Sequence, residues 1–273
     1  MARALILTYH AVERGRSPLC LDPALFAAHA EAIAASGARS LTVRDLASAL
    51  RDGALEEDVV AITFDDGFAS VAETAAPLLL DRGLTATVFC VAGHLGLLNY
   101  WQSARAGGYR ARLADAETLS ALERAGFEIA SHGVEHAPLA NASEEVARRE
   151  VIDSRVALEQ EVATGVTSFA YPYGAIPGPS ARRLVEETYD AACTTKLGRV
   201  SPTGDLHTLP RVDAHYLRRP ELLERALRGH LGGYLRARGL AARARRALVE
   251  DFVTSRSQPD RMNGGRPDGA DAS

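Results

Sequence analysis

Cysteine, aromatic residues and long apolar runs are all scarce in this sequence. Only three of the 273 residues are cysteine, and no two of them are close together. This excludes a disulfide framework and a CxxC zinc or redox motif. No apolar run approaches the ~18 residues that a bilayer-spanning helix needs. The first seven residues are apolar only briefly, too briefly for a secretory leader, so we expect a cytoplasmic protein.

Charge of either sign is in no large excess. The net charge is −4 at pH 7 and the pI is about 6.1, so a nucleic-acid partner is not expected. Hydrophobic residues make up 47% of the chain and charged residues 24%, which is typical of a soluble globular protein with a sizeable core. The composition therefore excludes collagen, a coiled coil and wholesale disorder.

Strand-like and helix-like segments alternate along the first 217 residues. Continuous apolar runs predict strands at 4–8, 59–64, 85–91, 127–130, 168–171 and 189–194. Apolar residues at helical spacing predict helices at 22–37, 42–50, 70–82, 115–125, 143–162 and 180–187. This alternation predicts an α/β fold with a parallel sheet, closed or nearly closed into a barrel, and helices outside it.

The C-terminal part differs in composition from the predicted barrel domain at 1–217. Residues 218–250 contain nine arginines and three glutamates, a local charge of +6, and are predicted to form a basic amphipathic helical extension. This extension is either a solvated outer helix or a weak contact for a membrane surface or an acidic partner. Residues 251–273 are rich in Gly, Pro, Asn and Ser, and we expect a disordered tail.

Four polar clusters follow predicted strands, each at the strand's C-terminal end. They are Thr8-Tyr9-His10, Thr63–Gly67, Ser131–His136 and Tyr171–Gly174. In a parallel β/α barrel these ends meet on one face, where active sites lie. The sequence therefore predicts one active site built from all four clusters.

Two adjacent carboxylates, Asp65 and Asp66, follow the apolar run at 59–64. Because consecutive strand residues point to opposite sides, we expect one aspartate to bind a cation and the other to lie beside it. An exposed Asp-Asp-Gly turn is an equal alternative on this motif alone.

His132 and His136 are four residues apart, so on a helical turn both imidazoles could bind one metal ion. With a strand-end aspartate they form a set of two histidines and one carboxylate, which leaves coordination positions open for water and substrate. Zinc suits these ligands best, and cobalt, nickel, iron and manganese are alternatives.

A divalent ion at such a site predicts metal-assisted hydrolysis of an amide or ester. The ion polarises a carbonyl group and lowers the pKa of a bound water toward about 7, and the second aspartate can then act as general base. His10 or another strand-end histidine could protonate the leaving amine. The turn at Tyr173 could direct a backbone N–H at the oxyanion.

These motifs resemble the polysaccharide deacetylase family, also called carbohydrate esterase family 4. The similarity rests on Thr63–Gly67, Ser131–His136 and Phe169–Gly174, and it covers residues 4–215. It implies a distorted (β/α)7 barrel that removes N-acetyl, and sometimes O-acetyl, groups from sugars with a divalent metal. It also implies that Asp65 is the general base. The implied metal ligands are Asp66, His132 and His136, and the implied oxyanion donor is the backbone N–H of Tyr173.

The sequence departs from the family pattern in two places. Many members have an arginine at the position of Ala170, where it orients the catalytic aspartate. Arg211 is a candidate replacement, and a surface salt bridge is an equal alternative for it. No Leu-x-His motif identifies the general acid, which leaves His207 and His215 as candidates. The branch that acts on poly-N-acetylglucosamine has an N-terminal Tyr-His pair that matches His10 and the tyrosine before it, so we favour His10.

The resulting hypothesis is a metal-dependent hydrolase that removes N-acetyl groups from an amino-sugar glycan or glycoconjugate. The alternatives are hydrolysis of a ureide or cyclic imide, and a carbohydrate-binding relative without catalysis. A lipid-linked sugar at the inner membrane face would suit the basic helix.

Three further residues have expected positions. His29 is expected on a helix surface and Cys90 in the core. Trp101 is expected either to stack against a sugar or to pack inside its own loop.

Overall fold

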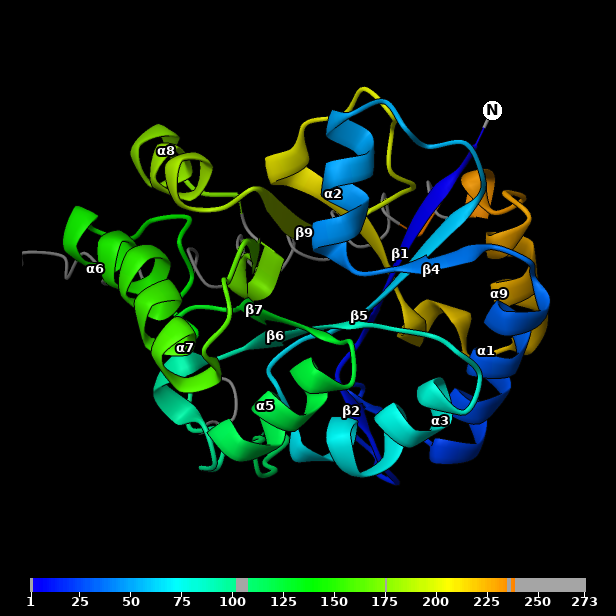
Figure 1. Cartoon of the computed structure of the whole chain (residues 1–273), viewed down its shortest axis with the longest axis horizontal. Helices are drawn as coiled ribbons and strands as arrows, with labels where there is room; N and C mark the ends of the chain where they lie inside the picture. The colour runs from blue at the N-terminus through cyan, green and yellow to red at the C-terminus, as the bar shows by residue number, and fades with distance from the viewer. Residues whose placement is uncertain (1, 102–107, 175, 235–236, 239–273) are drawn as a thin grey trace, which may run out of the picture.

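The computed structural model describes residues 2–101, 108–174, 176–234 and 237–238. Seven parallel strands form a closed barrel at its centre, with helices around it (Figure 1). The barrel strands are β1 (Ala4–Tyr9), β5 (Val59–Phe64), β6 (Thr87–Cys90), β7 (Glu128–Ser131), β8 (Ser168–Ala170), β9 (Ala191–Leu197) and β10 (Leu209–Asp213). Pairing of β1 with both β5 and β10 closes the barrel, which confirms the predicted fold class.

The base of the barrel is distorted by a short extra strand, β4 (Arg39–Leu41). It pairs with the first half of β5, whereas only the second half of β5 pairs with β6. The helix after it, α2 (Val43–Arg51), buries its apolar face among the inward-facing side chains of the barrel, including Ile6 and Phe89. This helix therefore closes the base of the barrel.

Small side chains line the middle of the barrel. Ala61, Ala130, Ala170 and Cys193 all belong to the buried inner cluster. Because the wall side chains are small, the interior accommodates larger groups such as Phe89 and the fully buried Arg211, whose guanidinium carbon lies 5.5 Å from the centroid of the Phe89 ring.

The outer helices begin where the sequence supplies caps. The side chains of Asp22, Thr42 and Asp115 accept hydrogen bonds from the first turns of α1, α2 and α5. The remaining helices and helical turns are α1 (Pro23–Ala35), η1 (Val71–Ala75), α3 (Ala76–Leu80), η2 (Ala92–His94), α5 (Ala116–Arg124), α6 (Glu144–Arg148), η3 (Arg149–Asp153), α7 (Ser154–Val162), η4 (Pro172–Gly174), α8 (Pro179–Thr188), η5 (Leu206–Thr208), η6 (Ala214–Leu217) and α9 (Pro220–Leu227).

The sequence predicted only six of the seven barrel strands. The seventh is β10, in which Pro210 and Arg211 interrupt the apolar run, so no continuous strand pattern is visible. Its register against β9 shifts between Leu209 and Arg211, as expected where a proline sits in a strand. A two-stranded sheet of β2 (Ala11–Val12) and β3 (Cys20–Leu21) was also not predicted.

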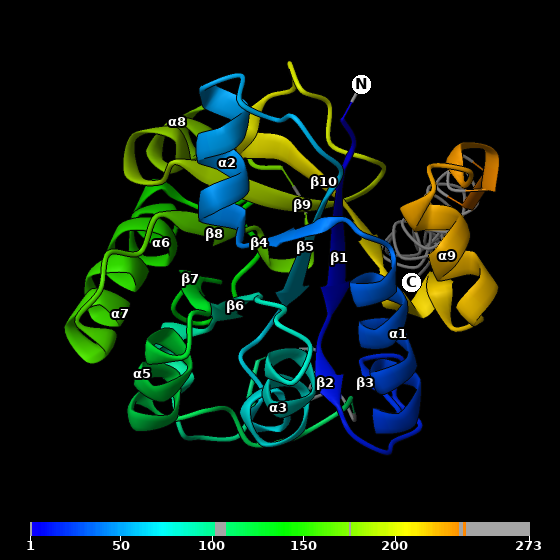
Figure 2. The same ribbon diagram turned by 45° about the vertical axis from the view of Figure 1, so that its right-hand side comes forward.

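Helix α9 packs along α1 on the outside of the barrel (Figure 2). It buries Leu223, Ala226 and Leu227 in the main core, so the start of the predicted basic extension is an outer helix. The later part of that extension, 239–250, and the predicted tail lie outside the described residues. Within the described part of the chain, no helix is long and apolar enough to cross a membrane.

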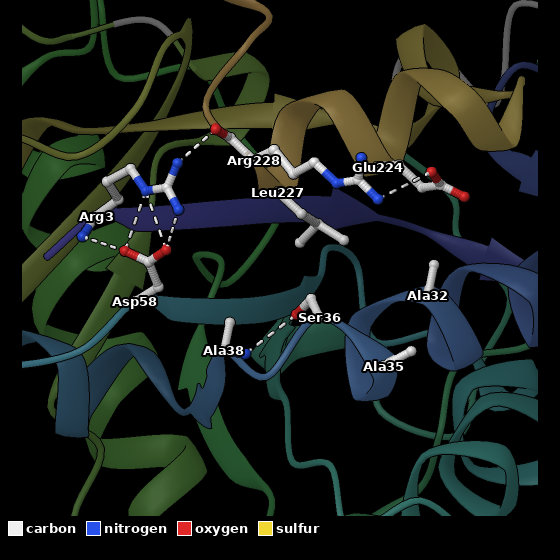
Figure 3. Close-up of a pocket in the computed structure, with 9 residues that line it drawn as sticks. All are labelled: Arg3, Ala32, Ala35, Ser36, Ala38, Asp58, Glu224, Leu227 and Arg228. Atoms are coloured by element: carbon white, nitrogen blue, oxygen red, sulfur yellow. Dashed lines mark hydrogen bonds and ion pairs between the residues drawn. The ribbon is translucent and has the colours of Figure 1, made fainter.

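A hollow opens beside the N-terminal ends of β1 and β5, between α1 and α9 (Figure 3). Arg3 forms an ion pair with Asp58 there and also donates a hydrogen bond to the carbonyl of Arg228. These contacts tie the two strands to the end of α9. The hollow lies at the end of the barrel opposite to the strand-end polar clusters.

Candidate active site

The C-terminal strand ends bring together the predicted metal ligands Asp66, His132 and His136. Their ligand atoms all lie within 4.8 Å of one another, and all three residues are buried. Asp66 Oδ1 is 3.6 Å from His132 Nε2 and 3.3 Å from His136 Nε2. Burial raises the pKa of Asp66. One carboxylate and two imidazoles converging on one point fit a divalent ion.

The adjacent aspartates have separate partners. Asp66 faces the two histidines, whereas Asp65 forms an ion pair with Arg211. Both aspartates are almost fully buried, so the alternative of an exposed Asp-Asp-Gly turn is wrong.

Backbone strain concentrates at this site. Asp66, His136 and Tyr173 have φ values of 73°, 57° and 60°, in the left-handed region that side chains other than glycine rarely occupy. Such conformations cost of order 1–3 kcal/mol each and are often found at functional sites. His132 and His136 therefore reach one point through a loop with left-handed residues rather than through the helical turn that their spacing suggested.

A hydrogen bond fixes the orientation of His132. Its Nδ1 lies 2.7 Å from the carbonyl oxygen of Ala170, which can only accept, so Nδ1 carries the proton. The lone pair is then on Nε2, the atom that faces Asp66. Histidine ligands of metals are commonly oriented by such a bond from the second nitrogen.

Aromatic rings hold His136 instead. The ring centroid of Trp101 lies 4.7 Å away at an interplanar angle of 32°, and that of Tyr173 lies 4.6 Å away at 64°. Burial holds the pKa of His136 well below its usual range, so this ring is neutral as a ligand requires. Trp101 is 6% exposed, which supports the interpretation that it packs its loop against the site.

Asp65 is held by a bidentate ion pair with Arg211. The Nη1–Oδ1 and Nη2–Oδ2 distances are 2.7 and 2.8 Å. Arg211 also donates to Thr63 Oγ1 and to the carbonyl of Thr194, so its position in the barrel is fixed. Burial by itself would raise the pKa of Asp65, but Arg211 and nearby histidines outweigh it and hold that pKa well below its usual range. Arg211 is therefore not a surface residue, and the carboxylate that it holds is ionised.

Among the histidines considered as general acid, the structure brings His10 to the site. It follows β1 directly and is half-buried, and the carbonyl of the preceding Tyr9 accepts a hydrogen bond from the N–H of Asp65 at 2.9 Å. His207 is hydrogen-bonded through Nε2 to the carbonyl of Tyr189 at 2.8 Å, on another part of the barrel.

The remaining candidate, His215, has an exposed side chain beside Tyr216. Within the described residues, neither His207 nor His215 contacts either aspartate of the site.

The expectation for His29 is wrong, because this residue is fully buried. Tyr9 donates its hydroxyl to His29 Nδ1 at 3.1 Å, and His29 Nε2 donates to the carbonyl of Leu217 at 3.2 Å. Burial lowers the pKa of His29 to about 4. The pair ties α1 and η6 to the end of β1, next to His10. Cys90 is buried in the core, as predicted.

One buried residue at the site was not identified from the sequence. Glu150 lies in η3, directly under the loop that connects the two histidines, and accepts hydrogen bonds from its backbone. It is 1% exposed, although its position in a long amphipathic helix pattern indicated an ordinary charged residue. Local sequence carries no signal for this contact, since the carboxylate and the loop are 13–16 residues apart.

The family model for polysaccharide deacetylases matches residues 52–192. The chain belongs to the polysaccharide deacetylase family. It is therefore a hydrolase of carbon–nitrogen bonds other than peptide bonds, as predicted. YxkH of Bacillus subtilis (strain 168) is 26% identical over 212 residues, which cover 77% of this chain and 71% of that protein.

A second relative is the poly-beta-1,6-N-acetyl-D-glucosamine N-deacetylase of Staphylococcus epidermidis. It is 23% identical over 187 residues, which cover 65% of this chain and 62% of that protein. Among solved structures, the Streptococcus pyogenes deacetylase PplD in complex with acetate has a TM-score of 0.71 at 24% identity and covers 83% of this chain and 98% of its own. IcaB from Ammonifex degensii has a TM-score of 0.69 at 20% identity and covers 82% of this chain and 98% of its own. These structural likenesses support the barrel fold.

Proposed function

We propose that this protein is a divalent-metal-dependent N-deacetylase of an amino-sugar glycan or glycoconjugate. The observation that carries the proposal is the placement of two buried groups side by side on one barrel face. One is the donor set of Asp66, His132 and His136, and the other is the ion pair of Asp65 with Arg211. The name of the Staphylococcus epidermidis relative supports N-acetylglucosamine polymers as the substrate class.

The donor set would hold the ion. His132 presents Nε2 because its Nδ1 donates to Ala170, and burial keeps His136 neutral. Zinc suits one carboxylate and two imidazoles, and cobalt, nickel, iron or manganese can use the same ligands. When bound, a divalent ion supplies Lewis-acid chemistry, which polarises a carbonyl group and makes water more acidic.

Asp65 acts as the general base. Its carboxylate accepts a proton from the water that attacks the acetyl carbonyl carbon, and the bidentate pair with Arg211 keeps it ionised and oriented for that transfer. Burial excludes bulk water from this exchange and strengthens the electrostatic interactions around the reacting atoms.

His10 and Tyr173 complete the reaction. His10 donates a proton to the departing amine nitrogen, so that the C–N bond breaks into acetate and a free amino sugar. The backbone N–H of Tyr173 donates to the oxyanion of the tetrahedral intermediate, and the left-handed conformation of this residue turns its peptide at the edge of the site.

We also propose a cytoplasmic location, with the basic residues of 218–250 bringing the enzyme to substrate at the inner membrane face. The high arginine content of this segment supports attraction to anionic lipids. Equal binding to anionic and neutral liposomes would count against this location of the substrate.

The experiment measures acetate release from N-acetylglucosamine oligomers by chelated protein and by protein with zinc or cobalt restored. We expect release only with metal, and a loss of roughly 10²–10⁴-fold in Asp65→Asn, while the exposed Asp81→Asn serves as the control. Wild-type turnover in Asp65→Asn would contradict the assigned base. Hydrolysis of imides without acetate release would favour the imide alternative, and metal-free glycan binding without turnover would favour a binding relative.

A further inference from the structure

A single carboxylate organises the loop between the two histidine ligands. Glu150 Oε2 accepts hydrogen bonds from the backbone N–H groups of Val134 and Ala137, both at 3.1 Å. Oε1 accepts the N–H of Glu135 at 3.0 Å, and Oε2 shares that donor at 3.3 Å. Three of the N–H groups in the short segment from His132 to Ala137 therefore point at one side chain.

Burial makes these hydrogen bonds strong. Glu150 is 1% exposed, and hydrogen bonds to an ionised acceptor are roughly twice as strong as neutral ones. Burial raises its pKa, whereas the backbone N–H groups of the loop oppose this rise. A buried carboxylate is costly without donors, so the loop and the glutamate stabilise each other.

The helical segment formed by α6, η3 and α7 departs from α-helical geometry at the turn that carries Glu150. The residue lies in the π-helical turn η3, between α6 and α7, and such one-turn bulges frequently occur at functional sites. Ser143 caps the start of this helical segment by accepting a hydrogen bond from the N–H of Val146. The carboxylate is thus supplied by a rigid, capped element.

Gly133 allows the close approach of the loop to Glu150. Its φ is 86°, and a Cβ atom at this position would clash severely with Glu150 Oε2 and would lie 3.7 Å from Pro172 Cγ. The glycine after His132 is therefore required both by its backbone conformation and by the carboxylate beneath it.

His136 depends on this loop more than His132 does. Within the described structure, His132 has a hydrogen bond from Nδ1 to Ala170, whereas His136 Nδ1 has no hydrogen-bond partner. His136 also has a left-handed backbone, which must be held by its neighbours. The N–H of Ala137, the residue directly after it, is one of the three bound by Glu150.

We propose that Glu150 is a positioning residue that holds the 133–137 loop so that His136 converges with His132 and Asp66 on one metal ion. It acts through the backbone of the loop and not by contact with substrate or metal. This inference rests on the metal site of the proposed function. The expected consequence is that removing the reach of Glu150 weakens metal binding itself, before any effect on turnover.

Three substitutions separate the reach of Glu150 from its charge. Glu150→Asp keeps the charge but withdraws the carboxylate by one methylene, so all three N–H groups lose their acceptor. Glu150→Gln keeps the length and one acceptor oxygen, which can still receive the N–H groups of Val134 and Ala137. Glu150→Ala removes both the charge and the acceptor oxygens. The exposed Glu161→Ala on α7 is the matched control.

The test is the dissociation constant of the full-length protein for cobalt, measured by titration of the cobalt absorption bands, with the thermal unfolding of the metal-free form as a second reading. We expect Glu150→Asp and Glu150→Ala to weaken cobalt binding about 10–100-fold, as substitutions behind metal ligands do. Glu150→Gln should weaken it by at most about fivefold, the effect of one lost hydrogen bond. Glu161→Ala should bind as wild type. The cobalt spectrum of Glu150→Asp should also change, which a loss of stability alone would not cause.

Two outcomes in the variants would overturn the inference. Unchanged cobalt binding and spectrum in folded Glu150→Asp would show that the carboxylate does not position the ligands. Cobalt binding that is intact in Glu150→Asp and lost in Glu150→Gln would depend on the charge of residue 150 and not on its reach. This result would also contradict the positioning role. If Glu150→Ala does not fold, the aspartate and glutamine variants still give this comparison. A wild-type protein that binds neither cobalt nor zinc would overturn both this inference and the proposed function, whereas wild-type binding with unaffected variants would overturn this inference alone.

Discussion

Arg211 and Asp65 are 146 residues apart in the sequence, and their side chains form a buried bidentate ion pair with N–O distances of 2.7 and 2.8 Å. The arginine comes from β10 and the aspartate directly follows β5, and these two strands flank β1 in the barrel. Because this buried ion pair also orients the carboxylate proposed as general base, both the stability of the barrel and the proposed catalysis depend on it.

Replacing Arg211 should affect both stability and the pH dependence of activity. Arg211→Ala leaves Asp65 buried without its cation, so we expect a loss of about 3–5 kcal/mol in the free energy of unfolding. The pKa of Asp65, which Arg211 holds down, should rise, so the acid limb of kcat/KM should move to higher pH. Urea unfolding and a pH–rate profile measure the two effects.

Arg211→Lys keeps the charge but not the bidentate geometry. Its free energy of unfolding and the position of its acid limb should therefore lie between those of wild type and Arg211→Ala. The exposed Arg124→Ala is the control and should change neither reading. An acid limb that stays in place in Arg211→Ala would contradict the role of Arg211 in keeping Asp65 ionised.

His10 should be required for amides but not for substrates with good leaving groups. His10→Ala should lower acetate release from N-acetylglucosamine oligomers by about 10²–10⁴-fold, because the amine cannot leave without a proton. Hydrolysis of an activated aryl acetate should be much less affected, since an aryloxide leaves unprotonated.

The same two substrates distinguish the other histidines. His207→Ala and His215→Ala should retain most of the amide activity, because neither side chain contacts the aspartates of the site in the described structure. Loss of amide activity in either of them, with His10→Ala active, would move the general acid away from β1.

Trp101 should report metal binding directly. It is the only tryptophan of the chain, and its ring centroid lies 4.7 Å from that of His136. Binding of zinc by His136 would change the charge next to the indole, so the tryptophan emission should change in proportion to occupancy. Fluorescence titration should give the same dissociation constant as equilibrium dialysis.

Trp101→Ala should weaken zinc binding because His136 loses one of its two supporting rings, whereas Tyr100→Ala removes an exposed ring from the same loop and should have little effect. Zinc binding without any change in emission would be inconsistent with the stacked arrangement.

His29 should make the barrel sensitive to acid. Its folded-state pKa is lowered to about 4 from 6.5, so the folded state favours the neutral ring. The stability it contributes is complete above pH 6.5 and is lost as the pH falls from there to about 4, by up to about 3 kcal/mol. Protonation would also prevent Nδ1 from accepting the Tyr9 hydroxyl.

Urea unfolding at pH 7 and pH 4.5 measures this effect. His29→Gln should be less stable at pH 7 and should lose less between the two pH values than wild type does. The exposed His230→Gln should behave as wild type. An equal pH dependence in His29→Gln and wild type would assign the acid sensitivity to other groups.

The sequence by itself determined those helices and strands whose signals come from residues close together in the chain. Caps such as Thr42 and the apolar run at 59–64 are local signals, so the helix and strand that follow from them were predicted correctly. The polar residues at strand ends also predicted that Asp66, His132 and His136 lie together, because parallel strands in a barrel must present their C-terminal ends on one face.

Only the tertiary structure decided the contacts between distant segments. The family resemblance left Arg211 open between holding Asp65 and a surface salt bridge, and the fold decided between them. No local pattern indicates that His29 lies under η6, or that a helical glutamate holds the loop before His136. Each of these polar groups is buried, and a buried polar group must find its partner wherever the packing of the whole chain places one. The sequence shows which groups are available, and the closing of the barrel decides which of them meet.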